Sequence, residues 1–339
     1  MSVSIKDVAL KAGVSIGTVS NAINRPDILS PTTLKKVQKA IDSLGFVPNA
    51  SARTLRAGKT RVLGLVVPDL ANPFFIDVSK GVNEAALKAG YAVILCNTDE
   101  DLDKEVQYLG ILASQKVQGI LITPARDSNK AIANLVGEGI SLALVDREAN
   151  DIKACSVAVD DATGGLLSLD HLYELGHRKI LLITGDANIP QVALRDSGIK
   201  TAIAQKAKNA RPSLKELRIS QMSTLAAYSS LNEYLKQSKV DFTAIICGND
   251  LIALGAIRAL REHNLEVPTD ISVIGYDDID FASSAIVPLT TISQPKYKLG
   301  YAAAELVIQD CENPEAHVHQ RIEFQPQLVI RNSTQRIKD

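Results

Sequence analysis

The spacing of apolar and polar residues changes near residue 60, and each side of that point predicts a different kind of fold. Before it, apolar residues recur at helical intervals, and residues 5–23 are typical of a helix, a tight turn and a second helix. Ser4 and Ser15 can cap the two helices, and Gly13 tolerates the positive φ of the turn. Four apolar residues at this spacing can share a small core: Val8, Ala12, Val19 and Ile23.

A third helix is predicted to begin at Pro31, after the capping residue Ser30, and to end at Gly45. Its apolar stripe consists of Leu34, Val37, Ile41 and Leu44. We therefore expect a three-helix domain over residues 1–47. Residues 48–60 can form only a short helix between a proline and a glycine. Such a helix is not stable alone, so this segment is expected to be a linker that folds when something holds it.

From Arg61 onward, continuous apolar runs alternate with amphipathic helical stretches. Such runs are typical of strands buried on both faces of a parallel sheet, and the alternation predicts a doubly wound α/β fold. The expected strands are Val62–Val67, Ala92–Cys96, Gly119–Ile122, Leu142–Val145, Ile180–Thr184, Ala244–Cys247 and Ile271–Gly275.

The segment 61–339 is long for a single sheet of this kind, so two lobes with a ligand cleft at the carboxyl ends of the strands are expected. We place lobe 1 at about residues 61–160 and 292–322, and lobe 2 at about residues 161–291 and 323–339.

Charge separates the two parts further. The whole chain carries a net charge of −1, but residues 1–60 hold nine basic and three acidic residues, a net charge of +6, which leaves −7 for the rest. Because residues 1–60 are basic and the rest of the chain is acidic, we expect only residues 1–60 to contact phosphate groups. On the second helix, small and polar side chains are expected to face outward, and they suit the floor of a DNA major groove: Gly17, Thr18, Asn21 and Ala22.

The sequence gives little support to a membrane protein, a secreted protein, a metalloprotein or an enzyme. No apolar run reaches membrane length and no apolar signal region begins the chain, so the expected compartment is the cytoplasm. The four cysteines are far apart and without metal-binding spacing, which favours core positions. His317-Val318-His319 can contact a metal, but no third ligand is evident, so a solvated loop, with no metal and no cofactor, is expected. Gly13–Gly17 matches a nucleophile elbow but follows a helix rather than a strand, and no catalytic pair is evident.

Polar and aromatic residues follow the ends of the predicted strands. Carboxylates, guanidinium groups and amides can hydrogen-bond the hydroxyls of a sugar, while phenyl rings cover its C–H faces. For one such residue, a helix cap or an ion pair at a domain edge is the better explanation, but six strand ends of this kind favour a binding cleft. The residues are Asn72, Phe74, Phe75, Asp146, Arg147, Arg195, Asn249, Asp277 and Gln294.

The chain strongly resembles the lactose/galactose repressor (LacI/GalR) family of bacterial transcription regulators from about Ile5 to Thr334. The resemblance implies a helix-turn-helix domain, a hinge helix and two doubly wound α/β lobes similar to periplasmic ribose-binding proteins, in a homodimer. It also implies that the nine strand-end residues above contact a sugar. The motifs that carry the resemblance are Ile5-Lys6-Asp7-Val8-Ala9, Ala12-Gly13-Val14-Ser15, Thr18-Val19-Ser20, Pro48-Asn49, Ala52-Arg53-Thr54-Leu55, Asn72-Pro73-Phe74-Phe75, Gly119-Ile120-Leu121, Asp146-Arg147, Leu175-Gly176-His177-Arg178, Asn249-Asp250, Ile274-Gly275-Tyr276-Asp277-Asp278 and Leu289-Thr290-Thr291-Ile292.

The same resemblance implies which residues contact DNA, and the chain also differs from the family pattern at a few positions. Major-groove contacts are expected from Ile16, Gly17, Thr18, Asn21 and Arg25. In the hinge, Leu55 is expected to wedge between bases in the minor groove, and Arg53 and Arg56 to neutralise phosphates. Ile16 and Gly17 replace a more usual polar pair, so no base preference carries over. In the cleft the departures are Ile189 and Gln191, which disfavour a purine effector, and Met222, which stands where many relatives have an aromatic residue.

Together, these features predict a repressor of sugar utilisation genes. The repressor is expected to bind a pseudo-palindromic operator and to be controlled allosterically by a ribose-like monosaccharide. Ligand binding is expected to close the cleft and change the distance between the two hinges. The alternative within this class is a global carbon catabolite regulator that uses a phosphorylated carrier protein as co-effector. Two other classes remain: an α/β enzyme, which turnover of a sugar would reveal, and a periplasmic binding protein, which needs a signal peptide and no basic head.

Overall fold

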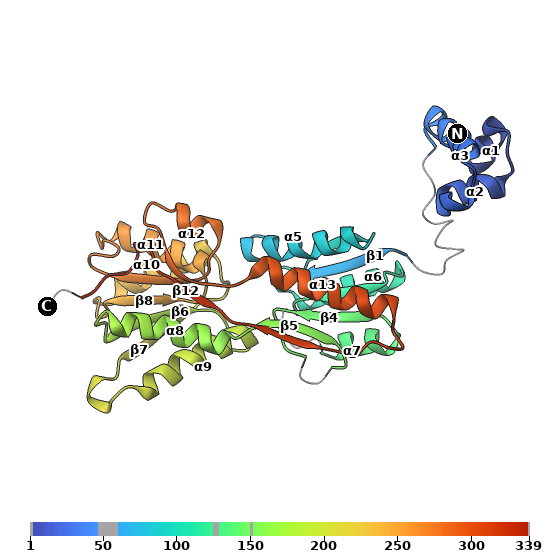
Figure 1. The fold of residues 1–339 in the computed structure, drawn as a ribbon. Coiled ribbons are helices and arrows are strands. Elements are labelled where there is room, and N and C mark those ends of the chain that lie inside the picture. The colour runs from blue at the N-terminus through green and yellow to red at the C-terminus, as the bar shows by residue number, and fades with distance from the viewer. Residues whose placement is uncertain (1–2, 47–59, 125–128, 150–151, 338–339) are drawn as a thin grey trace. The chain divides into compact units, whose positions relative to one another are not determined.

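The computed structural model describes residues 3–46, 60–124, 129–149 and 152–337 (Figure 1). The chain divides between Thr60 and Arg61 into two compact units, which are described separately below. The predicted linker 48–60 lies outside the described residues except for Thr60, and so do Arg53, Leu55 and Arg56. Within the described ranges, no helix is long and apolar enough to span a bilayer.

The N-terminal unit contains three α-helices whose ends are set by side-chain caps. Ser4 and Asp7 form a capping box at the first helix, and the Ser15 Oγ accepts a hydrogen bond from the Thr18 amide at 3.0 Å. Gly13 has a φ of 66°, as the turn requires. The elements are α1 (Ile5–Ala12), α2 (Ile16–Asn24), a 3₁₀ turn (Pro26–Ile28) and α3 (Pro31–Leu44).

The core of this unit agrees with the predicted apolar spacing in most positions. Val8 and Val19 are fully buried, and Ala12 and Ile23 pack against them from partly buried positions. Ala22 corrects one expectation, because it packs against the same core instead of facing outward. It lies three residues after Val19, and residues at that interval share a helix face.

The larger unit contains two six-stranded sheets (Figure 1). In lobe 1 the strand order is β11-β5-β4-β3-β1-β2 and all pairs are parallel. Its elements are β1 (Val62–Val67), α5 (Pro73–Lys88), β2 (Ala92–Asn97), α6 (Leu102–Ser114), β3 (Gly119–Ile122), α7 (Asn129–Gly137), β4 (Ser141–Val145), β5 (Cys155–Val159), α13 (Lys296–Glu312) and β11 (Arg321–Phe324).

Lobe 2 has the strand order β12-β10-β9-β8-β6-β7, and only the pairing of β12 with β10 is antiparallel among its described strands. Its elements are α8 (Asp161–Glu174), β6 (Lys179–Thr184), α9 (Pro190–Gln205), a 3₁₀ turn (Lys208–Ala210), β7 (Ser213–Arg218), α10 (Thr224–Gln237), β8 (Ala244–Cys247), α11 (Asp250–Glu262), β9 (Ser272–Asp277), α12 (Asp280–Ser284), β10 (Thr290–Ser293) and β12 (Gln327–Val329).

All seven predicted strands are present as strands, and Ile271 alone among their residues falls outside the observed bounds. Five strands were not predicted: β5, β7, β10, β11 and β12. In β7, β11 and β12 no position is fully buried, and polar or charged residues stand beside the apolar ones, so no long apolar run marks these strands. The apolar β5 is fully buried, and its omission has no such explanation.

The chain passes between the lobes near residues 160, 294 and 325. The first passage is where the predicted boundary lies. β10 extends to Ser293 and β11 to Phe324, so the other two passages lie about two residues beyond the boundaries predicted at 291/292 and 322/323. Each strand stays with the sheet that supplies its hydrogen bonds, and this pairing decides where the chain crosses.

Candidate functional site

All nine strand-end residues predicted to bind a ligand line one cavity between the lobes. Lobe 1 supplies Asn72, Phe74, Phe75, Asp146 and Arg147, lobe 2 supplies Arg195, Asn249 and Asp277, and Gln294 stands at a passage between them. The space is about 660 Å³ when the open solvent at its mouth is counted. The cavity is also lined by Pro68, Asp69, Glu100, Thr123, Pro124, Ile189, Gln191, Val192 and Met222.

Two amide side chains of the cavity also begin helices. The Asn72 Oδ1 accepts a hydrogen bond from the Phe74 amide at 3.0 Å at the start of α5. The Asn249 Oδ1 accepts one from the Ile252 amide at 2.8 Å at the start of α11. Helix capping therefore uses the amide oxygens. The NH₂ groups also have partners, because the Asn72 Nδ2 donates to Asp277 and the Asn249 Nδ2 donates to the Met222 carbonyl oxygen. Each NH₂ group has a second N–H with which to contact a ligand.

Phe74 and Phe75 are the aromatic residues of the cavity wall. Their rings meet edge to face, with centroids 5.0 Å apart and planes at 90°. Both lie in the first turn of α5, which begins at Pro73. An edge-to-face pair is a favourable arrangement of aromatic rings, so this wall presents a fixed apolar surface to whatever occupies the cleft.

Arg195 is held in place from three directions. Its Nε donates to the Asp161 Oδ1 at 2.7 Å, and its Nη1 donates to the Gly248 carbonyl oxygen at 2.8 Å. Its guanidinium lies 3.7 Å from the centroid of the Tyr276 ring, and the Tyr276 hydroxyl donates to the same Asp161 oxygen at 2.9 Å. Sequence reasoning missed Asp161, because it begins α8 just after a strand, β5, that had not been predicted.

Asp146 faces lobe 2 from the end of β4 and has a positive φ of 55°. The Gln191 Nε2 donates both to the Asp146 carbonyl oxygen and, at 3.2 Å, to its Oδ2, so this contact crosses the cleft. Burial and the neighbouring Asp161 raise the pKa of Asp146 to about 7, against the opposing effect of Arg195. Near neutral pH this carboxyl group therefore exchanges between its protonated and ionised forms.

Asp277 provides a second contact across the cleft. Its carboxylate accepts hydrogen bonds from the Asn72 Nδ2 at 3.3 Å and from the Gln294 Nε2 at 2.8 Å. Burial raises its pKa, and the nearby Arg195 opposes that shift. Its φ of 109° is unusual for a non-glycine residue, and such geometry is found where surrounding contacts hold the backbone.

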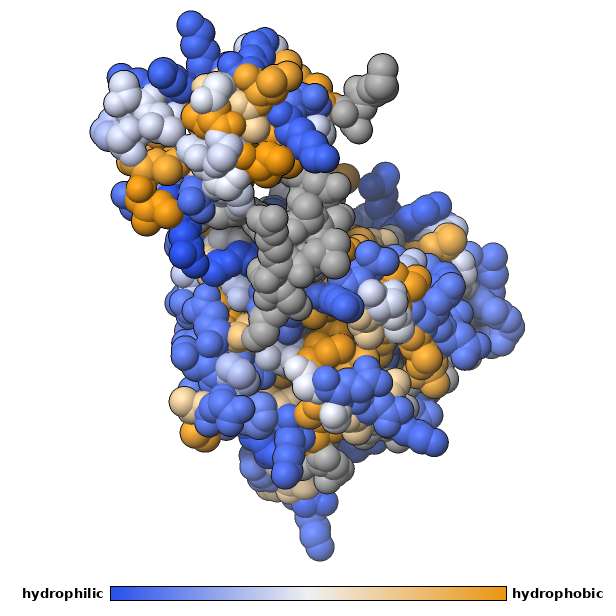
Figure 2. All heavy atoms as spheres, turned by 90° about the vertical axis from the view of Figure 1, so that its right-hand side faces the viewer, coloured by the Kyte–Doolittle hydropathy of each residue, from blue (hydrophilic) through white to orange (hydrophobic). Residues whose placement is uncertain are grey.

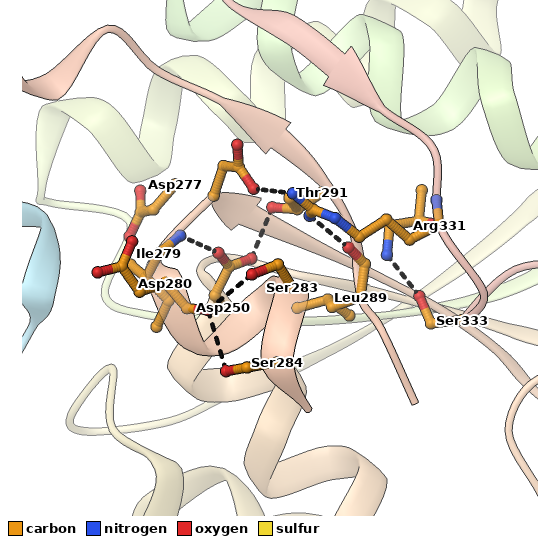
Figure 3. Close-up of polar contacts among 12 residues, drawn as sticks. Asp250, Asp277, Ile279, Asp280, Ser283, Ser284, Leu289, Thr291, Arg331 and Ser333 are labelled. Atoms are coloured by element: carbon orange, nitrogen blue, oxygen red, sulfur yellow. Dashed lines mark hydrogen bonds and ion pairs between the residues drawn. The ribbon is translucent and has the colours of Figure 1, made fainter. Parts of the chain in front are cut away.

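A buried carboxyl group, Asp250, supports the segment that follows Asp277 at the end of β9 (Figure 3). It accepts hydrogen bonds from the Thr291 hydroxyl at 2.6 Å and from the Ile279 amide at 2.9 Å. Burial and Asp277 raise its pKa to about 8. A Cβ at Gly275 would lie 2.1 Å from the Asp250 Oδ1, so this strand position has room only for glycine.

Five buried polar atoms of the cavity lining have no hydrogen-bond partner within the described part of the chain. They are the Thr123 Oγ1, Asp146 Oδ1, Arg147 Nε, Gln191 Oε1 and Gln294 Oε1. Leaving one buried polar group unpaired costs about 1–3 kcal/mol. When Asp146 is ionised, its Oδ1 and the Oε1 atoms of Gln191 and Gln294 act solely as acceptors of hydrogen bonds. The Arg147 Nε can only donate, and the Thr123 hydroxyl can do both. The lining therefore fits a small ligand that is rich in hydrogen-bond donors.

In the N-terminal unit, the residues predicted to contact DNA lie on or just after α2. Ile16, Gly17 and Arg25 are exposed, whereas Thr18 and Asn21 are half-buried. The Thr18 hydroxyl is 2.9 Å from the Ser15 hydroxyl, so it takes part in capping the helix. The start of α2 thus presents an apolar residue, a glycine and polar groups at its surface.

Comparison with known proteins gives matches to both units. Residues 4–49 match the model of bacterial regulatory proteins of the lacI family, and residues 60–330 match that of periplasmic binding proteins and the sugar binding domain of the LacI family. The transcriptional repressor PurR of Aliivibrio fischeri strain MJ11 is 35% identical over 97% of this chain and 98% of its own length. The transcriptional regulator RegA of Clostridium saccharobutylicum is 34% identical over 98% of this chain and 100% of its own.

Solved structures give a consistent result. A LacI family regulator from Enterococcus faecium with bound ribose is 31% identical, with a TM-score of 0.73 over 82% of this chain and 100% of its own. The lac repressor dimer bound to operator and the anti-inducer ONPF is 28% identical, with a TM-score of 0.85 over 99% of this chain and 100% of its own.

Proposed function

This chain belongs to the LacI family and is a DNA-binding transcriptional repressor, and we propose that a small ribose-like sugar bound between its lobes controls its affinity for operator DNA. The chain is accordingly a regulator rather than an enzyme. The observation that carries the proposal is the set of unpaired polar atoms in the cavity lining. Its excess of acceptors suits the hydroxyl groups of a monosaccharide.

The charges around the cavity favour a neutral ligand over a phosphorylated one. Asp146 and Asp277 face the cavity, with Asp161 behind Arg195, so the two lining arginines do not leave a surplus of positive charge. A phosphate group accepts hydrogen bonds and would face acceptor oxygens of Asp146, Gln191 and Gln294. A neutral polyol offers donors to each of these oxygens and acceptors to the arginine.

The aromatic wall supports the same class of ligand. Phe74 and Phe75 form an edge-to-face pair in the cavity lining, and aromatic rings there suit the C–H face of a sugar. The repressors named PurR are relatives over nearly the whole chain. Ile189 and Gln191 differ from the purine-responsive branch, and the Gln191 Nε2 here donates to Asp146, so we favour a sugar over a purine.

On the DNA side, we propose that α2 enters the major groove with Ile16, Gly17, Thr18, Asn21 and Arg25 at the contact. In the linker, Leu55 is proposed to intercalate in the minor groove, with Arg53 and Arg56 on phosphates; these three residues lie outside the described ranges. We propose that ligand binding is coupled to DNA binding through the two lobes. The contacts Gln191–Asp146 and Asn72–Asp277 join the lobes across the cleft, so a ligand there acts on both.

A homodimer is proposed from the apolar surface of lobe 1. β2 is an edge strand, and its consecutive residues Ile94 and Leu95 are each 42% exposed, so neither face of the strand is covered there. On α6, Val106 and Ile111 are also exposed. In a space-filling view of one face, apolar side chains gather in patches between hydrophilic ones (Figure 2). Exposed apolar surface of this kind marks association sites.

Calorimetry on the full chain tests the effector assignment. We expect heat of binding with ribose, weaker binding with other pentoses and hexoses, and none with their phosphates or with purines. An operator titration with and without ribose then shows whether the sugar changes DNA affinity. Binding of phosphorylated sugars or purine bases alone would reject the sugar assignment while leaving the repressor assignment intact.

The alternative function is a global carbon catabolite regulator that uses a phosphorylated carrier protein as co-effector. It predicts that operator binding responds to that protein and not to free sugar. The unpaired polar atoms within the lobe cavity favour the sugar. A titration of operator with the carrier protein in place of ribose separates the two.

A further inference from the structure

Three potential metal ligands from distant parts of the sequence meet at one edge of lobe 1. Cys155 is the first residue of β5, and His317 and His319 lie between α13 and β11. β11 pairs with β5 with Arg321 opposite Ser156, and this register brings the two histidines to the cysteine. From the sequence alone a solvated loop was expected here, because no third ligand was evident. The structure supplies a third candidate ligand, Cys155.

The two distances from the sulfur to the nitrogens are close to those around a single ion. The Cys155 Sγ lies 3.1 Å from the His317 Nε2 and 3.8 Å from the His319 Nδ1, and all three atoms lie within 4.8 Å of one another. In a tetrahedral zinc site, bonds of about 2.3 Å to sulfur and about 2.0–2.1 Å to nitrogen place sulfur and nitrogen about 3.6 Å apart. The two observed distances lie on either side of that value.

The surroundings of the cluster suit an ion that enters from solvent. Cys155 is buried, His317 is half-buried and His319 is exposed, so the cluster is closed on the side of the sheet and open on the other. The Gln320 amide lies 3.5 Å from the Cys155 Sγ and donates toward it. A backbone N–H donor to the sulfur stabilises a thiolate and orients it, as outer-shell contacts do in metal sites.

We propose that Cys155, His317 and His319 form a binding site for a divalent transition-metal ion of the zinc class. The Cys155 thiolate, the His317 Nε2 and the His319 Nδ1 provide three ligands, and a water molecule from the open side completes a tetrahedron. Binding releases the thiol proton to solvent. One thiolate and two imidazoles form a donor set that binds zinc in preference to calcium or magnesium.

This site is separate from the sugar cleft. The cleft lies at the carboxyl ends of the lobe 1 strands, where Asp146 follows β4, whereas Cys155 stands at the amino end of β5. Four residue steps along that strand correspond to about 13 Å. An ion here fastens the segment after α13 to the lobe 1 sheet, just before the chain makes its last passage into lobe 2.

Cobalt titration of the untagged, reduced, metal-free full chain tests this proposal. We expect one Co²⁺ per chain, a near-ultraviolet thiolate-to-cobalt charge-transfer band, and visible bands of tetrahedral geometry, all removed by added Zn²⁺. Cys155→Ser is expected to abolish the charge-transfer band. His317→Gln is expected to weaken Co²⁺ affinity by roughly tenfold or more.

Matched controls come from the same residue types elsewhere. Cys96→Ser changes another buried lobe 1 cysteine, and His263→Gln changes a histidine that bonds to Asn232, so both are expected to leave the band unchanged. Absence of the band in the unmodified chain would overturn the site and reduce the cluster to a thiol hydrogen-bonded to a histidine. A band that survives Cys155→Ser would equally overturn it.

Discussion

Single carboxyl groups of the cleft are placed where burial and mutual repulsion oppose their ionisation. Asp146, Asp161 and Asp277 surround Arg195, and the guanidinium pairs directly with Asp161. The other two carboxyl groups have raised pKa values, because burial outweighs the attraction of Arg195. A ligand hydroxyl that donates to either carboxylate favours its ionised form.

The affinity for sugar is therefore expected to depend on pH through Asp146. Its pKa is about 7 in the empty cleft, and a bound hydroxyl that donates to the unpaired Oδ1 lowers it. Affinity is full where Asp146 is already ionised and is lost as the pH falls below its pKa. Between about pH 8 and about pH 6 we expect a decrease of about tenfold. Calorimetry in buffers of different ionisation enthalpy measures both the affinity and the released proton.

Asp146→Asn is the matched variant for this test, because it keeps the shape of the side chain and removes its titration. Its affinity is expected to be lower and nearly independent of pH in that range. An unchanged pH dependence in this variant would assign the effect to another group, with Asp250 the first candidate, since its pKa is about 8.

Asp277→Ala is expected to weaken sugar binding by about tenfold or more. The substitution removes an acceptor of the cleft and also leaves the Asn72 and Gln294 amides without the carboxylate that holds them. Asp241→Ala is the control, because Asp241 pairs with Lys215 on the exposed surface of the same lobe. Equal affinities for the two variants in calorimetry would contradict the assigned role of Asp277.

Among the helices, the contact between α8 and α9 positions a residue of the cleft. A Cβ at Gly165 would lie 2.0 Å from the Arg195 carbonyl oxygen, so the two backbones touch where α9 carries Arg195. Gly165→Ala is expected to force the helices apart, to destabilise the fold by about 1–3 kcal/mol, and to weaken sugar binding. Denaturant unfolding and calorimetry measure the two effects.

Gly137→Ala is the control for that substitution. Gly137 ends α7 without a positive φ, and a Cβ there would have no neighbour within 4 Å among the described residues. Alanine at this position is expected to be neutral or to stabilise by up to about 1 kcal/mol. If both variants unfold at the same denaturant concentration, close approach of the backbones is not what Gly165 provides.

The linker element carries a separate prediction. Leu55 stands in a stretch that is otherwise polar or small, so Leu55→Ala is expected to weaken specific operator binding while leaving sugar affinity and dimerisation intact. Unstacking bases costs a few kcal/mol, which an apolar wedge offsets. Fluorescence anisotropy with operator DNA measures the change. An operator affinity equal to that of the unmodified chain would exclude intercalation by Leu55.

For the whole molecule we predict a dimer and not a tetramer. The prediction rests on the exposed apolar residues of the edge strand β2 and of α6 in lobe 1, which offer one surface for association. Analytical ultracentrifugation at micromolar concentration is expected to give a dimer, and Leu95→Lys on the open edge of lobe 1 is expected to shift it toward monomer. A stable tetramer, or a Leu95→Lys variant that remains fully dimeric, would contradict the respective part of this prediction.

The sequence by itself determined the elements whose signals are local. Capping serines, Gly13 and Gly45 define the ends of the helices in the N-terminal unit, and continuous apolar runs mark the buried parallel strands. Because parallel strands end at one edge of a sheet, residues that follow them meet, and all nine predicted cleft residues line a single cavity.

Only the tertiary structure decided what depends on pairing between distant segments. The half-exposed strands β7, β11 and β12 form because a neighbouring strand provides hydrogen bonds for their backbone groups. No long apolar run in the sequence predicts them. Asp161 comes to Arg195, and Gln191 to Asp146, through the packing of helices and lobes. Cys155 meets His317 because β11 aligns with β5, and a register between strands so far apart along the chain leaves no mark in the spacing of residues.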